Sequence, residues 1–260
     1  MPRANRYFIP GQIWHITHRC HEREFLLKFA KDRRRWIHWL FEAKKRYDLR
    51  VLNYALTSNH IHMLVMDSGD PKIIPSSMDL ISGRTAQEYN LRKGRSGAFW
   101  QDRYHATAVE SGIHLLNCMV YIDLNMVRAG VVRHPREWPH CGYREIVGAR
   151  QRYNLIHWAS LLMALGMKTR EDFKRDYAEW VERASRGPGL ARDSKWTESI
   201  AVGGKEFIGK VKEDLGIKAI GRRIEEVIGE NGHHGWILRE DRKAYSHAFP
   251  YKNEGLRPKI

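Results

Sequence analysis

The 260-residue chain contains only three cysteines and no long apolar run. Cys20, Cys118 and Cys141 are odd in number and widely spaced, which argues against a disulfide framework and a cysteine zinc site and favours a reducing compartment. No apolar stretch approaches the roughly 18 residues that cross a bilayer. The basic first residues are not followed by an apolar segment, so no secretory signal is expected. These features predict a cytoplasmic protein with no membrane partner.

Acidic residues are scarce relative to basic ones. Lys and Arg number 45 against 30 Asp and Glu, giving a net charge of +15 and a pI of about 9.8. This excess favours a polyanionic partner, because Lys and Arg release condensed counterions when they neutralise phosphates. Nine tryptophans and eleven tyrosines add rings that can stack on unpaired bases. Binding to a membrane surface calls for a basic amphipathic helix, and none is obvious in the sequence. Nucleic acid is therefore the favoured partner. The alternative is a basic protein whose aromatic residues are all core.

Hydrophobic periodicity divides the chain into two parts. In residues 1–147, strands are expected at 13–19, 51–57 and 60–66, another strand pair within 99–109, and helices at 31–47, 76–91 and 111–128, the last capped by Ser111. This order predicts an α+β fold, a small antiparallel sheet of ferredoxin-like type with helices packed on one face. Residues 148–260 are expected to form a mainly helical extension that recognises DNA, with helices at 169–184, 205–215 and 218–228, and a disordered end at 251–260. The helices at 205–215 and 218–228 faintly suggest a helix–turn–helix.

Two histidines are separated by one residue in the expected strand at 60–66. Side chains alternate between the faces of a strand, so His60 and His62 lie on one face and Ile61 on the other. Paired imidazoles form half of a divalent-metal site. With 14 histidines in the chain, such a pair also arises by chance, so the pattern needs a second element.

That second element is the expected helix at 111–128. At 100° per residue, its apolar residues gather on one side, and a polar stripe lies on the other, formed by His114, Asn117, Tyr121, Asn125 and Arg128. Tyr121 and Asn125 are one turn apart and must be neighbours. Asp123 falls among the apolar residues, so an arginine or a backbone group is expected to pair with it.

Together these motifs resemble the single-tyrosine HUH transposases, specifically the REP-associated tyrosine transposases. The resemblance rests on Asn-His-Ile-His-Met-Leu-Val at 59–65 and Tyr-Ile-Asp-Leu-Asn-Met-Val-Arg-Ala-Gly at 121–130, with Tyr-Asn at 89–90 and Gly-Ala-Phe-Trp-Gln-Asp-Arg-Tyr at 97–104 between them. It covers about residues 10–147, and continues more weakly through 203–208. Met126 stands where the family usually has proline, and Cys141-Gly142 where Ser-Ser is common; neither position carries a catalytic atom.

The resemblance implies a metal-dependent DNA strand transferase that nicks single-stranded DNA at palindromic, hairpin-forming repeats. In this family likeness His60, His62 and Asn125 bind Mg²⁺ or Mn²⁺, and Tyr121 attacks the scissile phosphate. The product is a 5′-phosphotyrosine and a free 3′-hydroxyl. A phenol is both a nucleophile and a good leaving group, so the covalent link is reversible, as strand exchange requires. Such a protein is expected to be nucleoid-associated, and to be a monomer or a homodimer.

Several further residues are candidates for contacts with DNA, each with a structural role as the alternative. The loop after residue 91 is basic and has no apolar residue to bury, which favours phosphate contacts. The candidates are Arg92, Lys93, Arg95, Trp100, Arg103, Tyr104, Asn117 and Arg128.

Two other functions fit part of the pattern. A non-catalytic regulator that retains the scaffold would bind DNA or RNA without cutting it. A metal-dependent hydrolase would use the two histidines without covalent chemistry, and would need carboxylate ligands, for which Asp67 and Asp70 are the obvious candidates.

Overall fold

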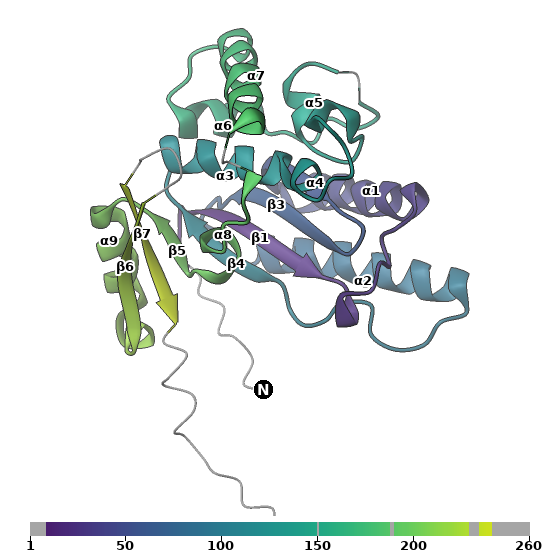
Figure 1. The fold of residues 1–260 in the computed structure, drawn as a ribbon. Helices are drawn as coiled ribbons and strands as arrows, with labels where there is room; N and C mark the ends of the chain where they lie inside the picture. Colours follow the sequence, from purple (N-terminus) through teal and green to yellow (C-terminus); the bar gives the residue numbers. More distant parts are fainter. Residues whose placement is uncertain (1–8, 150, 188–189, 229–233, 241–260) are drawn as a thin grey trace, which may run out of the picture.

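The computed structural model describes residues 9–149, 151–187, 190–228 and 234–240. The disordered end expected at 251–260 lies outside these residues. The strands are β1 (Ile13–Arg19), β2 (Arg50–Leu56), β3 (His60–Met66), β4 (His105–Val109), β5 (Ala201–Gly203), β6 (Arg222–Ile228) and β7 (His234–Glu240). They form one seven-stranded sheet in the order β2-β3-β1-β4-β5-β7-β6, antiparallel except between β4 and β5 (Figure 1).

The helices flank this sheet. They are α1 (Ala30–Tyr47), α2 (Ile73–Lys93), α3 (Ile113–Asp123), α4 (Asn125–Arg128), α5 (Tyr143–Ile146), α6 (Trp158–Leu165), α7 (Arg170–Arg186), α8 (Lys195–Glu198) and α9 (Lys205–Leu215), with 3-10 turns at His21–Arg23, Pro135–Glu137 and Gly216–Ala219. The order β2-β3-β1-β4 with α1 and α2 is the ferredoxin-like arrangement, so the predicted α+β fold is confirmed.

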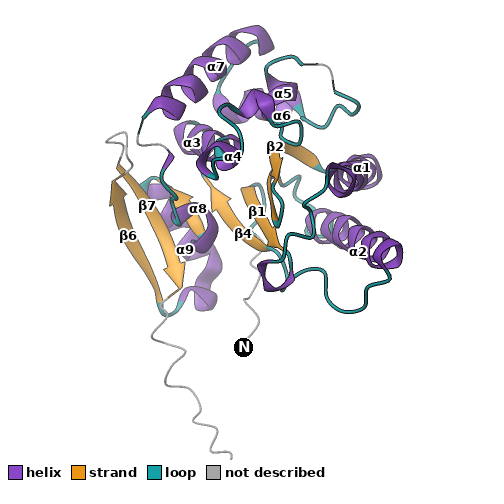
Figure 2. Cartoon of the chain, turned by 45° about the vertical axis from the view of Figure 1, so that its right-hand side comes forward, coloured by secondary structure: helices purple, strands orange, loops and turns teal. Residues whose placement is uncertain are grey.

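The two faces of the sheet carry different helices. In Figure 2, α1 and α2 lie together on one side of β1–β4, whereas α3, α4 and α7 lie on the other. The expectation that helices pack on one face was therefore wrong. The second face is covered because α3 buries its apolar residues Leu115, Met119 and Ile122. This arrangement places α3 opposite the strand residues that share a face with His62.

Most expected elements were found, and three local predictions were wrong. Phe99–Tyr104 is not a strand; Trp100 makes only an isolated bridge to Cys20. The helix expected at 111–128 begins after Gly112, not after a Ser111 cap, and is interrupted at Leu124, which separates α3 from α4. The step is small, because Arg128 N–H still donates to the Leu124 carbonyl oxygen at 2.8 Å.

The third wrong prediction lies in the C-terminal part. The segment at 218–228 is a 3-10 turn followed by β6, which pairs with β7, so no helix–turn–helix forms there. Among the described residues after 148, more lie in helices than in strands. The longest of these helices, α7, begins after Thr169, whose hydroxyl accepts a hydrogen bond from the Asp172 N–H. Because β5 pairs with β4, the C-terminal part extends the sheet of the N-terminal part.

Candidate active site

His60 and His62 lie on the face of β3 that is turned toward α3, with ring centroids 4.9 Å apart. The Nδ1 of His60 lies 2.7 Å from the Asn59 side-chain oxygen. The amide orientation of Asn59 is fixed, because its Nδ2 donates to the Arg23 carbonyl oxygen at 3.0 Å. Nδ1 of a neutral His60 therefore carries the proton and donates it, which leaves the Nε2 lone pair available. Asn59 thus orients the first histidine.

His62 belongs to a chain of four groups. Its Nδ1 lies 2.9 Å from Nε2 of His15, and Nδ1 of His15 lies 2.8 Å from the Trp196 carbonyl oxygen. The planes of the two rings are within 12° of each other, as an in-plane N–H···N contact requires. On its other side, Nε2 of His62 contacts the Asn125 side-chain amide nitrogen at 3.0 Å. The predicted ligands His60, His62 and Asn125 are thus brought together.

All three histidines are held neutral. Burial lowers the pKa of His15 and of His60 to about 3, and it lowers the pKa of His62 well below its usual value. The nearby Arg19 guanidinium adds to the shifts of His60 and His62. A metal ion binds the neutral imidazole, so the site needs no deprotonation near neutral pH.

Tyr121 lies beside this cluster on α3. Its ring centroid is 6.0 Å from that of His62 and 6.5 Å from that of His15, in both cases edge to face. The Arg128 guanidinium packs on the ring at 4.4 Å, and the Trp196 indole lies 6.2 Å away. The residue is only 8% exposed, and this burial raises the pKa of its phenol, against the opposing effect of Arg128. The predicted nucleophile and the predicted ligands share one site.

A cleft of about 280 Å³ opens beside the two histidines of β3. Four arginines line it, namely Arg19, Arg23, Arg103 and Arg192, together with His60, His62 and polar residues of β1, β4 and the segment 197–198. Two acidic residues, Asp102 and Glu198, also line it, so the charge is predominantly positive. Tyr121 lies behind His62 and is not among the lining residues. The cleft suits a phosphodiester strand, because guanidinium groups pair with phosphate oxygens.

The segment 190–200 covers the tyrosine from the C-terminal part of the chain. Arg128 Nε donates to the Leu190 carbonyl oxygen at 3.0 Å. The Thr107 hydroxyl on β4 donates to the Ser199 carbonyl oxygen at 2.7 Å, and the Ala108 N–H donates to the Ile200 carbonyl oxygen at 2.8 Å. These hydrogen bonds fix the backbone on both sides of Trp196.

Some of the site residues that were not predicted follow a local pattern that the sequence does contain. His15, Thr17 and Arg19 alternate along β1, and Thr17 pairs with His62 while Arg19 pairs with His60, so all of them face the site. Alternation within the expected first strand could have identified His15 and Arg19 once its pairing with the strand at 60–66 was known. Trp196 and Arg192 have no such signal, because only long-range packing brings them here.

The predicted DNA contacts are dispersed. Arg103 lines the cleft. Trp100 stacks on His18 with centroids 4.2 Å apart, and Tyr104 is buried against the same ring. Asn117 is half-buried on α3, and Arg128 is engaged with Tyr121 and Leu190.

The basic residues at the end of α2 are partly occupied by contacts within the protein. Arg92 pairs with the buried Asp32 and packs on Tyr89, Lys93 lies 5.4 Å from the Phe29 ring, and Arg95 bonds to Ala98 and Glu24. Their role in binding DNA stays a prediction.

The two carboxylates expected for a hydrolase, Asp67 and Asp70, make their hydrogen bonds in the loop after β3 and are not brought to the histidines. Asp67 follows the far end of β3 and accepts from the N–H groups of Gly11 and Gly69. Asp70 accepts from the Lys72 N–H. Both carboxylates therefore serve the loop after β3.

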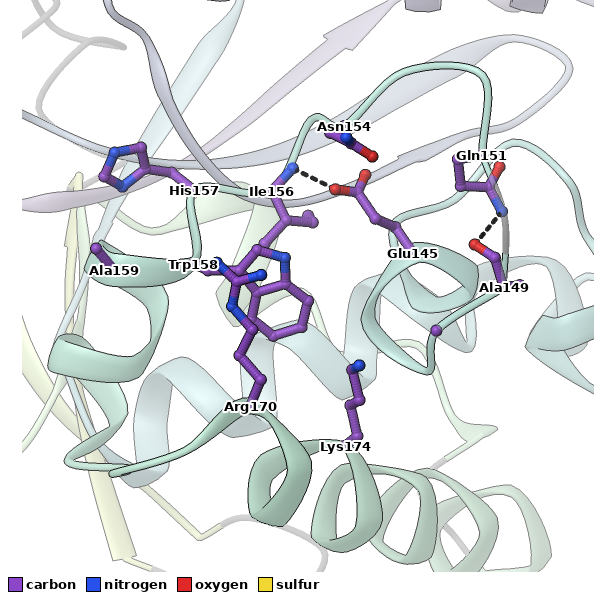
Figure 3. A pocket seen from close by; sticks show the side chains of 11 residues that line it. Glu145, Ala149, Gln151, Asn154, Ile156, His157, Trp158, Ala159, Arg170 and Lys174 are labelled. Atoms are coloured by element: carbon purple, nitrogen blue, oxygen red, sulfur yellow. Dashed lines mark hydrogen bonds between the residues drawn. The ribbon is translucent and has the colours of Figure 1, made fainter.

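A larger cavity, of about 630 Å³, lies elsewhere, between the loop 148–157, α6 and the start of α7 (Figure 3). Trp158, Arg170 and Lys174 line it with the buried Glu145. In the described part of the chain, no group of three or more His, Cys, Asp or Glu side chains could hold a metal ion.

The donor set at His60, His62 and Asn125 nevertheless fits a divalent ion. Two neutral imidazoles and one amide oxygen leave coordination positions for phosphate and water, as catalytic sites require. The hydrogen bond from the Asn125 amide to Nε2 of His62 occupies the lone pair that an ion would take. Ion binding would therefore replace that hydrogen bond.

Residues 10–125 match the family model described as "Transposase IS200 like". The match covers β1 to β4 and α3, and ends at Asn125, so all four residues of the predicted site fall within the matched segment. The segment that carries Trp196 lies outside it.

Two solved structures are similar to the chain. One is a REP-associated tyrosine transposase bound to a REP hairpin, with 20% identity, a TM-score of 0.49, and coverage of 60% of this chain and 90% of that chain. The other is a candidate transposase from Deinococcus radiodurans R1, with 13% identity, a TM-score of 0.32, and coverage of 50% and 92%. The comparison with curated proteins gave no match. No helix among the described residues combines the length and apolarity needed to cross a membrane.

Proposed function

We propose that this protein is a metal-dependent nuclease and strand transferase that acts on single-stranded, hairpin-forming DNA through a 5′-phosphotyrosine. One observation carries the proposal: His62 lies 3.0 Å from the Asn125 amide nitrogen and 4.9 Å, between ring centroids, from His60, and the ring of Tyr121 lies beside it. The match of residues 10–125 to the family model described as "Transposase IS200 like" supports the same reaction class. By resemblance of its motifs, the substrate is a palindromic repeat.

In the proposed reaction, the Tyr121 oxygen forms a bond to the scissile phosphorus. The bond from phosphorus to the 3′ oxygen breaks, the phenol proton leaves, and the 3′ oxygen takes up a proton. Burial raises the pKa of Tyr121, so the phenol is protonated at neutral pH and must lose its proton during attack. A bound Mg²⁺ or Mn²⁺ would polarise the phosphate and orient it for in-line displacement.

The chain's own residues have separate tasks in this proposal. His60, His62 and Asn125 hold the ion, and Arg19 and Arg192 in the cleft bind the phosphates of the strand. Tyr121 lies beside His62 and Trp196 but does not line the cleft, so in this proposal the phenol moves toward the cleft before attack. Further parts of the proposal are a cytoplasmic, nucleoid-associated location and a monomer or homodimer. We also propose that residues 1–147 form the catalytic domain and residues 148–260 an extension that recognises DNA.

The experiment is a denaturing gel of the protein with a labelled single-stranded DNA hairpin in Mg²⁺ or Mn²⁺. The wild-type protein is expected to form a covalent adduct that chelator prevents. Tyr121→Phe should lose the adduct and keep its affinity for the hairpin, whereas the control Tyr153→Phe, remote from the site, should behave as wild type. An adduct formed by Tyr121→Phe would refute the assignment.

The same gel separates the alternatives. Hairpin binding without cleavage in either metal would identify a non-catalytic regulator. Metal-dependent cleavage with no adduct at any time would identify a hydrolase.

A further inference from the structure

We propose that His15 is a positioning residue that fixes the tautomer of His62, and that the Trp196 carbonyl oxygen anchors it. The inference rests on the proposed function only in treating His62 as a metal ligand. The inference gives the segment that carries Trp196 a role in supporting the metal site, although this segment lies outside the matched residues 10–125.

The direction of every proton in the chain follows from its last member. A carbonyl oxygen only accepts, so Nδ1 of His15 must donate to Trp196. His15 is fully buried, and its ring nitrogens contact a carbonyl oxygen and an imidazole rather than a carboxylate, so the ring is neutral. Its Nε2 therefore has a lone pair and must accept from Nδ1 of His62. Nε2 of neutral His62 is then the unprotonated nitrogen, and it faces Asn125.

This nitrogen is the one that the metal needs. A histidine that donates its other N–H to a fixed acceptor is held in one tautomer and one ring orientation, and is a more basic ligand. The His62 ring cannot swing away while its Nδ1–H is bonded to His15, which is fully buried. His60 reaches the same state through a different acceptor: its Nδ1 donates to the Asn59 side-chain oxygen, and the Asn59 amide is itself held by the Arg23 carbonyl oxygen.

Trp196 is held independently of the metal ligands. The Thr107 hydroxyl and the Ala108 N–H on β4 bind Ser199 and Ile200 directly after α8. The position of the Trp196 carbonyl is therefore set by the sheet that also carries His15.

The test uses the full chain with ¹⁵N-labelled histidine. In the metal-free protein, the shifts of His62 should show a protonated Nδ1 and an unprotonated Nε2. His15→Leu removes the acceptor and should weaken Mn²⁺ binding, measured by electron paramagnetic resonance, by about 10- to 100-fold. His15→Gln keeps an amide that can accept from His62 and donate to Trp196, so it should restore most of the affinity.

Three outcomes would overturn the inference. They are an Nε2-protonated His62 in the wild type, unchanged Mn²⁺ affinity in His15→Leu, and equal losses in the Leu and Gln variants at equal thermal stability. If the wild-type protein bound Mn²⁺ but formed no covalent adduct through Tyr121, the result would count against the proposed function and would leave the inference about His15 intact.

A second, independent observation concerns the 630 Å³ cavity. Arg170 and Lys174, one turn apart on α7, lie 5.0 and 5.9 Å from the Trp158 ring (Figure 3). In the described structure neither pairs with a carboxylate, whereas Arg175 on the same helix binds both Asp172 and Asp176.

The acidic residue in this cavity does not neutralise the two cations. The Glu145 carboxylate accepts from the N–H groups of Leu155 and Ile156 at 3.0 and 2.9 Å and is buried. We infer that the cavity binds backbone phosphates of the DNA substrate, because two unpaired cations on an aromatic wall are the pattern of a nucleic-acid contact. His157 N–H donates to Val51, four residues along β2 from the partner of His62, so this contact is separate from the cleft.

The test compares hairpin binding over a range of salt concentrations. Arg170→Ala with Lys174→Ala should weaken binding and reduce the slope of log K against log salt by about 1 to 2. Arg175→Ala should leave both unchanged. An unchanged slope in the double variant, or a mononucleotide that binds the cavity while hairpin affinity stays constant, would overturn the inference. This test measures only DNA binding, so it remains valid even if the protein does not cleave DNA.

Discussion

The Tyr177 hydroxyl donates a 2.5 Å hydrogen bond to the Asp123 carboxylate inside the protein. Both residues are buried, and the bond joins α7 of the C-terminal part to α3, which also carries Tyr121. Burial raises the pKa of Asp123 to about 7. The partner expected for Asp123 was an arginine or a backbone group. The backbone of Tyr143 does bond to Asp123, but the Tyr177 hydroxyl, which was not expected, is the main partner.

Removing this hydroxyl is expected to destabilise the protein. Tyr177→Phe keeps the ring but leaves the buried Asp123 without its donor, so the free energy of unfolding should fall by about 1–3 kcal/mol. Urea denaturation measures the change. Tyr153→Phe is the control, because that hydroxyl makes a 3.2 Å contact with His38 in a less buried place and should cost less. Equal losses of unfolding free energy in the two variants would show that the hydrogen bond to Asp123 contributes no more to stability than the contact between Tyr153 and His38.

The parts of the site that could be predicted are those encoded by a local pattern in the sequence. Alternation in β3 and the helical spacing of Tyr121 and Asn125 are local, so the sequence could predict which residues share a face of each element. That the strand and the helix form one site was implied only by the family resemblance. The Trp196 carbonyl and Arg192 reach the site only through packing of the segment 190–200 on β4, which no local period encodes.

The misassigned strand has a physical cause. In β6, Ile224, Val227 and Ile228 follow the three-four spacing of a helix, and most of the strand is exposed, so no alternation of buried and exposed residues reveals it. Its pairing with β7 decides its conformation. Likewise, the apolar residues of Phe99–Tyr104 pack against α2 and His18 rather than in a strand ladder.

Asn59 is expected to control metal affinity through His60. Asn59→Ala removes the oxygen that accepts from Nδ1 and so frees the ring to turn and change tautomer. The affinity for Mn²⁺ should fall by about 10- to 100-fold. Calorimetric titration measures it, with Asn90→Ala as the control because that amide bonds the Gly97 carbonyl oxygen away from the site. Wild-type affinity in Asn59→Ala would mean that Thr57 alone orients the ring.

Arg19 is expected to bind the DNA strand in the cleft. It lies next to His60 in the β1–β3 register and lines the cleft. Arg19→Gln should weaken binding of a single-stranded oligonucleotide and reduce the magnitude of its salt slope by about 0.7, the value for one phosphate contact. Fluorescence anisotropy at several salt concentrations measures both. Arg186→Gln, which removes an exposed guanidinium paired with Glu182, should leave the slope unchanged; if it does not, the slope reports net charge and not the cleft.

His140 should make stability depend on pH. Its side chain is buried, and burial together with Arg33 and Arg34 lowers its pKa to about 4, against 6.5 for a free histidine. Between these values the unfolded chain binds more protons, so the contribution of His140 is complete above pH 6.5 and is lost as the pH falls toward 4. Relative to His140→Gln, the wild type should lose about 1 to 2 kcal/mol of unfolding free energy between pH 7 and pH 5, with allowance for solvent screening.

Denaturant titrations at both pH values give this difference directly. The comparison between variants cancels the similar contributions of His15, His60 and His62, whose lowered pKa values act in the same direction. A difference between wild type and His140→Gln that stays constant from pH 7 to pH 5 would mean that His140 is protonated in the folded protein as readily as in the unfolded chain.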